Sequence, residues 1–456
     1  MQRSSHAAVV MPRYQASPKP RVYVATFPLA PSAPTLSVEA GRARRYPGLG
    51  GDGPDTRAVY AGAAELLGGA RQVVDFGCGS GMGTAELAGR FERVSAIDAD
   101  LGAVRFARTY LAQVPSVEVL HAPDGVSSEA SNGHDAGCII DVLGQLPTPV
   151  NLLRTARGWL GKEGRLFVAE PLAFPTQALL PPVLRAFSRP GLSQLLLRAG
   201  WEVERWVDGV GHFASCIARP SVHAGWDWLA QADLERERGH WSLALEAYTG
   251  ALQHAPPALE SEALLGAAEV HAARGELDDA CRCLLDAARA TPGHVRAVAG
   301  LADLSLLSGD VRQSLSLAVR ALESDPCDMV AVQALARAAD RLELPDAFAS
   351  FRIANGLAPA ELGAAIELGR LAAARGELSY AIWVLERVRE FRDDLVADFH
   401  VTLGWLYLAS GRRGEARLEA ELGRVKEPQS SGVHELWAQL EADGNLARSG
   451  EAACAS

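Results

Sequence analysis

The stretch from Val73 to Gly81, which reads Val-Val-Asp-Phe-Gly-Cys-Gly-Ser-Gly, decides the fold. Apolar residues lead to the acidic Asp75, and glycines follow at alternate positions. Glycine adopts backbone conformations that other residues avoid, and without a Cβ it lets a ligand lie directly on the main chain. The stretch therefore predicts a strand, a tight turn and the start of a helix, as at a nucleoside-cofactor site. A turn that serves only the path of the chain is the alternative.

The spacing of the glycines separates two kinds of cofactor site. The dinucleotide fingerprint Gly-x-Gly-x-x-Gly fails at its third glycine, because Met82 occupies that position. A dinucleotide site places a pyrophosphate at the start of the helix. A site for S-adenosylmethionine instead needs room for a methionine and an acceptor for its ammonium group. The Gly-x-Gly-x-Gly pattern favours the second kind.

Two further acidic residues follow expected strands. Asp98 stands at the end of Ala-Ile-Asp, seventeen residues after Gly81, where its carboxylate can accept both hydroxyls of a ribose. A helix cap is the alternative for Asp98, although Asp100 is better placed as the N-cap. Asp124 follows the next strand and could meet the amino group of an adenine, or could belong to a simple Asp-Gly turn.

Strand and helix patterns alternate around this stretch and predict a mostly parallel, doubly wound sheet. The expected strands are 72–76, 93–98, 116–121, 136–141 and 164–169, and the expected helices are 58–67, 84–91, 101–113 and 150–160. Two final strands, 201–207 and 211–218, are joined by a short Asp-Gly turn and should be antiparallel.

From Trp226 onward the sequence shows only helical patterns, with a recurring glycine. The glycines are spaced by 36, 34, 67 and 35 residues, at Gly239, Gly275, Gly309, Gly376 and Gly411. The double-length gap holds a degenerate repeat with Glu343 in the glycine position. This period predicts stacked helical hairpins. We expect six repeats and a capping helix near 433–442 within residues 226–443.

Composition limits the remaining possibilities. A chain of 456 residues needs more than one core, and its formal charge of -11 makes nucleic acid an unlikely partner. The seven cysteines form no Cys-x-x-Cys pair, so we expect no metal site. We find neither a signal-peptide pattern nor an eighteen-residue apolar run, and therefore expect a cytoplasmic protein without membrane contact. Residues 1–56 are predicted to be a largely disordered or extended arm, and 444–456 a disordered tail.

Residues 57–220 resemble the class I S-adenosylmethionine-dependent methyltransferases, particularly the small-molecule group that includes quinone-biosynthesis enzymes. The stretch VVDFGCGSG is similar to motif I of that family, AIDAD to its second motif, and 135–171 to its fourth strand, helix and fifth strand. The resemblance implies a Rossmann-like α/β domain with sheet order 3-2-1-4-5-7-6 and S-adenosyl-L-methionine as cofactor. The residues it implies for cofactor binding are Asp75, Gly77, Cys78, Gly79, Gly81, Asp98, Ala99 and Asp124.

The acceptor of the methyl group is less well marked. Gly144 and Gln145 stand where many relatives carry a His after the fourth strand. The chain lacks the Asn/Asp-Pro-Pro-Tyr/Phe motif and the paired-glutamate loop of two amino-group methyltransferase classes, which favours another acceptor. A general base is needed only if the acceptor loses a proton. Asp141 and Glu170 are the catalytic candidates, with structural or cofactor-shell roles as the alternative; His212 is a more distant candidate.

The second region resembles tetratricopeptide repeats, an all-α solenoid that exposes a concave surface to protein or peptide partners. In the first repeat the resemblance rests on Trp228, Ala232, Gly239, Ala244 and Tyr248. The leading hypothesis is a methyltransferase of the EC 2.1.1 type, whose repeats recruit or position a protein partner. The alternatives are a non-catalytic scaffold with a vestigial or cofactor-sensing fold, and a protein methyltransferase whose repeats dock its substrate. An array that only dimerises or braces the enzyme also stays open.

Overall fold

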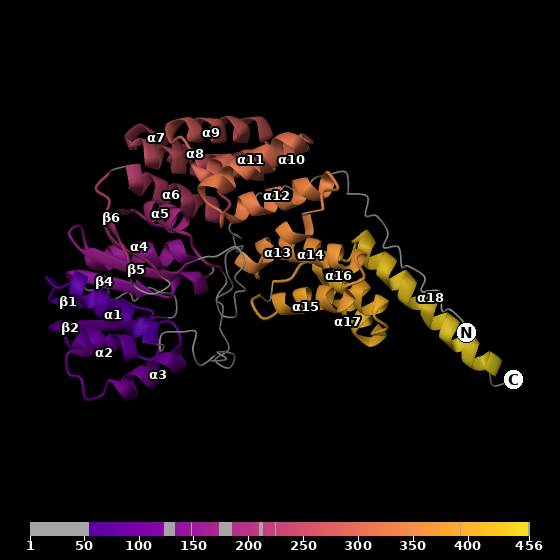
Figure 1. Cartoon of the computed structure of the whole chain (residues 1–456), viewed down its shortest axis with the longest axis horizontal. Coiled ribbons are helices and arrows are strands. Elements are labelled where there is room, and N and C mark those ends of the chain that lie inside the picture. Colours follow the sequence, from indigo (N-terminus) through magenta and orange to yellow (C-terminus); the bar gives the residue numbers. More distant parts are fainter. Residues whose placement is uncertain are drawn as a thin grey trace. The chain divides into compact units, whose positions relative to one another are not determined.

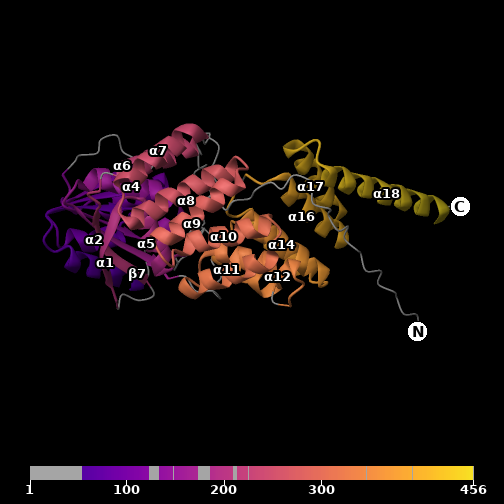
Figure 2. The same ribbon diagram turned by 90° about the horizontal axis from the view of Figure 1, so that it is seen from above.

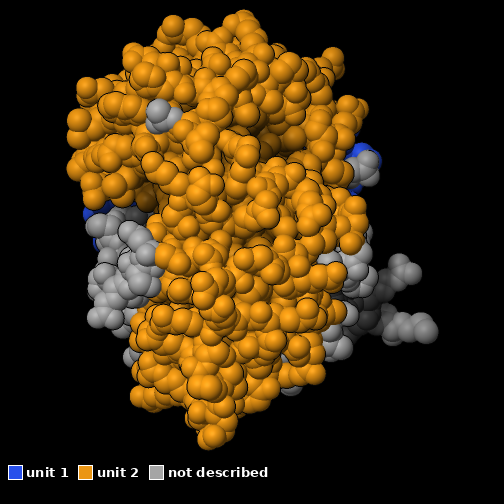
Figure 3. Space-filling view, turned by 90° about the vertical axis from the view of Figure 1, so that its left-hand side faces the viewer, with its two compact units in different colours: residues 1–21, 178–182, 335–456 blue, residues 22–177, 183–334 orange. Residues whose placement is uncertain are grey.

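A computed structural model describes residues 54–122, 133–146, 148–172, 185–208, 213–223, 225–345, 347–392 and 394–454. The chain forms two compact units (Figure 3). Unit 2 holds the described residues up to Ala334, and unit 1 holds those from Leu335 onward. Two candidate residues, Asp124 and His212, lie outside the described residues, as does the predicted arm up to residue 53.

Unit 2 begins with a seven-stranded sheet of order β3-β2-β1-β4-β5-β7-β6 (Figure 1). The strands are β1 (Gln72–Phe76), β2 (Arg93–Asp98), β3 (Val117–His121), β4 (Ala136–Ile140), β5 (Arg165–Pro171), β6 (Trp201–Val207) and β7 (Phe213–Pro220). The first five strands pair in parallel, and β7 pairs antiparallel with both β5 and β6. The expected sheet order and the antiparallel final pair are therefore confirmed.

The helices around the sheet are mostly those that the sequence predicted. They are α1 (Pro54–Leu66), α2 (Met82–Ala88), α3 (Leu101–Tyr110), the short helix η1 (Leu143–Gln145), α4 (Pro149–Leu160) and α5 (Arg189–Arg198). The sequence analysis missed α5. Its start carries sound signals, because the Ser188 hydroxyl accepts a hydrogen bond from the Gly191 N–H at 3.0 Å, and Pro190 lies in the first turn, where a missing N–H costs little.

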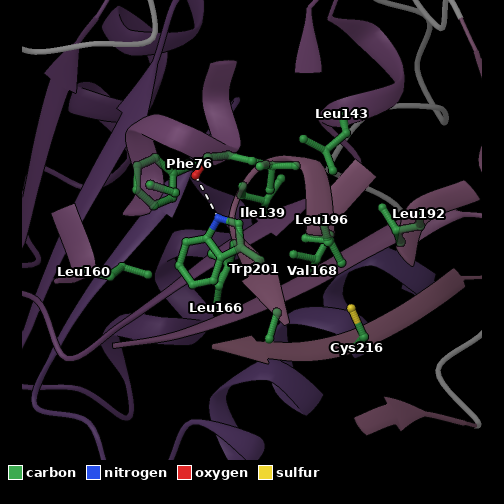
Figure 4. Packing of buried hydrophobic residues seen from close by; sticks show 14 of the residues in the cluster. Phe76, Ile139, Leu143, Leu160, Leu166, Val168, Leu192, Leu196, Trp201 and Cys216 are labelled. Carbon is green, nitrogen blue, oxygen red and sulfur yellow. Dashed lines mark hydrogen bonds between the residues drawn. The ribbon is translucent and has the colours of Figure 1, made fainter. Parts of the chain in front are cut away.

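One core of the sheet domain is built around Trp201. Its side chain is fully buried, and its indole N–H donates to the Leu153 carbonyl at 2.9 Å (Figure 4). Leu166 and Leu196, both fully buried, belong to the same cluster, which joins the sheet to α4 and α5. A buried indole needs a hydrogen-bond acceptor, and this one ties the start of β6 to α4.

Helices follow one another from α6 onward (Figures 1 and 2). In unit 2 they are α6 (Gly225–Glu237), α7 (Trp241–His254), α8 (Pro257–Ala273), α9 (Leu277–Ala290), α10 (Val295–Leu307), α11 (Val311–Ser324) and the first part of α12 (Met329–Arg341). In unit 1 they are the rest of α12, α13 (Ala347–Leu357), α14 (Leu362–Ala374), α15 (Leu378–Val388), α16 (Ala397–Ala409), α17 (Arg413–Lys426) and α18 (Ser431–Cys454).

The recurring glycines occupy the turns between paired helices, all in the left-handed region. Gly239 has a φ of 75° and Gly275 of 78°. Glu343, in the degenerate repeat, adopts a φ of 55° and so keeps the turn at a conformational cost that glycine avoids. The expected solenoid of helical hairpins is thus confirmed. The last helix, α18, extends through most of the segment predicted to be a disordered tail, which is rich in helix-forming Ala.

Within unit 2 a buried network of charges joins the sheet domain to the first repeats. Arg198 on α5 donates through Nε and Nη2 to Asp233 on α6, at 3.0 and 2.8 Å, and Arg154 on α4 donates to the same carboxylate at 2.7 Å. Arg236 on α6 lies 2.8 Å from Glu269 on α8, which is 3.6 Å from Arg198. Buried charges are tolerated only when they are paired, and here the partners come from α4, α5, α6 and α8. We therefore expect the sheet domain and the first repeats to fold as one body.

Candidate functional site

The carboxyl ends of β1 and β4 lie side by side at the point where the order of the sheet reverses. This edge, with the turns that follow β1 and β4, is termed the crevice. From β1 the chain moves to β2 and β3 on one side, whereas β4 is followed by β5 on the other. In open α/β sheets, ligands bind outside the strand ends at such a switch point. The stretch Val73–Gly81 places its glycines at this point.

The three glycines of the turn all have positive φ: 81° for Gly77, 53° for Gly79 and 83° for Gly81. A Cβ on Gly77 would lie 2.4 Å from a methyl group of Val142, so the turns after β1 and β4 touch. A Cβ on Gly79 would meet no atom within 4 Å. The backbone at Gly79 therefore faces open space, as a cradle for a ligand requires.

Asp98 lies beside this open backbone. Its carboxylate accepts hydrogen bonds from the N–H of Gly79 and from the N–H of Asp100, both at 2.8 Å. Burial raises the pKa of Asp98, and the two N–H donors act in the opposite direction. Ala99 continues the same turn, and Asp100 caps α3 by accepting from the Ala103 N–H at 2.9 Å, as predicted.

Asp75, on β1, is directed into the protein. The side chain is 0% exposed, and its carboxylate accepts hydrogen bonds from Tyr60 at 3.1 Å and Thr84 at 2.6 Å, and from the Cys138 thiol at 3.4 Å. Burial raises the pKa of Asp75 to about 6. Because Tyr60 lies on α1 and Thr84 on α2, these bonds tie β1 to both helices. The cofactor contact of Asp75 stays a prediction.

Cys78 stabilises the glycine turn through its main-chain N–H group. Its thiol is buried, and burial raises the pKa of that thiol. The N–H groups of Gly77 and Cys78 donate to the Ile97 carbonyl at 2.8 and 3.0 Å. These bonds hold the turn against β2 and so keep the glycine backbone next to Asp98.

Asp141 follows β4 in a conformation that L-residues rarely adopt. Its φ is 58°, and its N–H donates to the Ala169 carbonyl at 2.9 Å. Burial raises the pKa of Asp141 to about 7. A strained backbone at a ligand-binding edge often marks a functional residue.

Glu170, the second catalytic candidate, serves the turn that follows Asp141. It is 1% exposed, and its carboxylate accepts hydrogen bonds from the N–H groups of Val142, Leu143 and Gly144 at 2.9, 2.7 and 3.1 Å. Burial and the charge of Asp141 raise the pKa of Glu170 to about 8, while the three N–H donors act to lower it. Both oxygens of Glu170 thus accept backbone N–H groups, which favours the structural alternative. Its catalytic role stays a prediction.

The structure thus brings together the glycine turn, Asp98 and Asp141. Sequence reasoning missed Tyr60 and Thr84, which hold Asp75, since neither stands in a motif. It noted Gln145 only as a replacement for His, whereas its side-chain N–H donates to the Asp141 carbonyl at 2.6 Å. A hollow of about 600 Å³, lined by residues such as Ala136 and Arg165, lies at the opposite, amino-terminal ends of β4 and β5 and is separate from this crevice.

Residues 74–168 match the family model described as "Methyltransferase domain". These residues form a methyltransferase domain. Its match starts in the strand before the glycine turn and ends in β5, so it includes Asp98 and Asp141. The cofactor that fits a methyltransferase domain with this turn is S-adenosylmethionine. In the part of the chain that the structure describes, no helix is long and apolar enough to span a membrane.

Several solved structures are similar to parts of this chain, and no curated protein matches it. A mitomycin 7-O-methyltransferase is 23% identical, with a TM-score of 0.33, over 37% of this chain and 54% of its own length. A SAM-dependent methyltransferase from Aquifex aeolicus is 19% identical, with a TM-score of 0.33, over 37% and 93%. A TPR protein from Thermus thermophilus is 20% identical, with a TM-score of 0.34, over 40% and 99%. The chain spans about half the length of the first of these structures.

Proposed function

We propose that this protein is an S-adenosylmethionine-dependent methyltransferase of the EC 2.1.1 type, whose repeats recruit or position a protein partner. The observation that carries the proposal is the open backbone of Gly79 beside Asp98, at the switch point of a methyltransferase domain. The Asp98 carboxylate would receive the ribose hydroxyls, and the glycine turn would lie under the nucleoside.

Methyl transfer requires the chain mainly to position the two reactants. S-adenosylmethionine, when bound, supplies a methyl group on a sulfonium that is already activated for displacement. The residues of the crevice have to hold the acceptor in line with that methyl group and exclude water. If the acceptor is neutral, its proton must leave, and Asp141 is the carboxyl group in the crevice that lacks a described partner.

The test of the cofactor is a calorimetric titration of the full chain with S-adenosylmethionine and with S-adenosylhomocysteine. The variant Asp98→Asn should lose affinity for both, because an amide accepts hydrogen bonds at one oxygen only. Glu118→Gln, an exposed acid on the neighbouring β3, is the matched control and should bind like the wild type. Absence of binding in the wild-type protein would refute the proposed function.

The partner of the repeats is part of the proposal. A small pocket of about 50 Å³ lies among α8, α9, α10 and α12. Leu265, Leu304 and Val330 line it, together with the charged Glu269 and Arg296. We infer that a protein segment binds there and is either the methyl acceptor or its carrier. The test compares wild-type protein with Leu304→Glu and with the control Leu285→Glu on the exposed side of α9. A captured protein that gains label from methyl-labelled S-adenosylmethionine, and that only Leu304→Glu loses, would support the inference.

A further inference from the structure

Asp141 combines a strained backbone with a carboxylate that has no described partner. At a φ of 58° it is one of two non-glycine residues with positive φ among the described residues; the other, Glu343, lies in a repeat turn. A residue other than glycine in this region costs stability, and the cost persists only where the surroundings impose the conformation. Among the described residues none donates a hydrogen bond to the Asp141 carboxylate.

The surroundings impose this conformation through three contacts with the main chain. Glu170 accepts the N–H groups of the three residues that follow Asp141, and so fixes the direction in which the chain leaves β4. Gln145 donates its side-chain N–H to the Asp141 carbonyl at 2.6 Å. The Asp141 N–H is bonded to Ala169 on β5 at 2.9 Å. Hydrogen bonds therefore hold the peptide groups on both sides of Asp141, whereas its carboxylate accepts none from the described residues.

The turn that follows Asp141 also contacts the glycine turn. Val142, the residue next to Asp141, occupies the space where a Cβ of Gly77 would lie. The position of Asp141 is consequently fixed relative to Gly77 as well as relative to β5. A carboxylate with a fixed position, limited exposure and no protein donor is suited to a donor supplied by a ligand.

We propose that Glu170 and Gln145 are positioning residues, which hold the Asp141 carboxylate to accept a hydrogen bond from a protonated ligand group. The inference rests on the proposed function. Two sources could supply that group. One is the ammonium of the cofactor, and the other is the N–H or O–H of the methyl acceptor. In the second case Asp141 takes the proton as the bond from acceptor to methyl carbon forms and the bond from sulfur to that carbon breaks. The burial that raises the pKa of Asp141 to about 7 suits either role.

The experiment uses two probes that differ in the amino-acid portion, which carries the ammonium group. S-adenosylhomocysteine has this portion, and 5′-methylthioadenosine has the same thionucleoside with a methyl group in its place. Calorimetry on the full chain compares the wild type with Asp141→Asn, Asp141→Gly, Glu170→Gln and Gln145→Leu. If the cofactor is the source, Asp141→Asn lowers affinity for S-adenosylhomocysteine by about ten- to a hundredfold, as expected for one charge-assisted hydrogen bond, and leaves 5′-methylthioadenosine unchanged.

If the acceptor is the source, all variants bind both probes equally, and the Asp141 carboxylate stays accessible in the S-adenosylhomocysteine complex. Carbodiimide coupling to an added amine, located by peptide mass spectrometry, should then modify Asp141 in the wild type. Glu170→Gln and Gln145→Leu should change the extent of that coupling. Unchanged affinities together with an unreactive Asp141 would overturn the proposal. A wild-type protein that binds neither probe would instead show that the proposed function is wrong.

Asp141→Gly separates the role of the carboxylate from a role in folding. Glycine takes a positive φ without steric cost, so this variant should melt at or above the wild-type temperature. It should nevertheless reproduce the binding defect of Asp141→Asn, or remove the site of coupling. Glu170→Gln is interpreted only if it keeps a cooperative melting transition, and otherwise Gln145→Leu tests the positioning role.

Discussion

Replacing Asp233 by Asn should destabilise the sheet domain and the first repeats together. The side chain is 1% exposed, and its carboxylate accepts hydrogen bonds from Arg198 at 3.0 and 2.8 Å, from Arg154 at 2.7 Å and from the Tyr248 hydroxyl at 2.7 Å. Asparagine keeps the size of the side chain but removes the negative charge and turns a donor toward the guanidinium groups.

The magnitude follows from burial. Removing one partner from a buried ion pair costs about 3–5 kcal/mol, because the remaining charge stays in a poor solvent. Burial alone would raise the pKa of Asp233, but the guanidinium groups of Arg198, Arg236 and Arg154 hold it well below its usual range. A depressed pKa contributes stability that is present above the ordinary value of 3.8 and is lost only as the pH falls through the folded-state value. The destabilisation should therefore be undiminished between about pH 5 and pH 8.

The assay is thermal unfolding of the full chain, followed by calorimetry. The entropy of unfolding is about 2.1 cal/mol/K per residue, so a unit of about 300 residues has roughly 0.6 kcal/mol/K. A cost of about 3–5 kcal/mol should therefore lower its midpoint by roughly 5–8 °C. Glu92→Gln is the matched control, because Glu92 makes the same two-pronged contact with Arg71 at 3.0 and 2.8 Å on the exposed surface. There water screens the charges, and the midpoint should hardly move.

Two results would decide against this reasoning. If Asp233→Asn melts like Glu92→Gln, the network does not join the two parts of unit 2 in solution. If only one of two separate transitions shifts, the sheet domain and the repeats unfold independently. Should Asp233→Asn fail to fold, Tyr248→Phe can be used instead. It removes one hydroxyl group that donates to the same carboxylate, and it should lower the midpoint by a smaller amount.

Further predictions concern the crevice. Gly77→Ala places a Cβ 2.4 Å from Val142 at a φ of 81° and should strongly lower the melting temperature. Gly79→Ala carries only the cost of its φ of 53°, because its Cβ meets no atom, and should lower the melting temperature less while it weakens cofactor binding. Equal melting losses in both would contradict the geometry. The pKa of Asp141 is about 7 against an ordinary 3.8, so the folded protein retains a proton that the unfolded chain releases. Wild-type stability should therefore fall as the pH rises between those values, and urea titrations of Asp141→Asn should lack that part of the loss.

The sequence by itself determined the order of the elements and the kind of site. Alternation of strand and helix patterns, with the glycines after β1, predicts a doubly wound sheet, because each signal is local to a few consecutive residues. The recurring glycines mark the hairpin turns for the same reason. Glu343 could be assigned to a glycine position because it lies in the double-length gap between Gly309 and Gly376. Helix α5 was missed because its short pattern follows a proline-rich apolar stretch.

Only the tertiary structure decided which groups the acidic residues contact. Four acidic residues stand near strand ends in the sequence: Asp75, Asp98, Asp141 and Glu170. The sequence suggested the cofactor for the first two and catalysis for the last two, but it did not show which groups each carboxylate contacts. Folding directs Asp75 to Tyr60 and Thr84, and Glu170 to three backbone N–H groups. It leaves Asp98 at the open glycine turn and Asp141 without a described donor. These differences depend on contacts between residues as many as 63 positions apart, which no local pattern records.

The join between the two parts of unit 2 was likewise invisible in the sequence. Arg198 and Asp233 are 35 residues apart and lie on helices with different roles, one beside the sheet and one in the first repeat. Each would be read as an ordinary surface charge on an amphipathic helix. Their burial arises only when α5 packs against α6 and α8, because a charge leaves water only where folding supplies an opposite charge at hydrogen-bond distance.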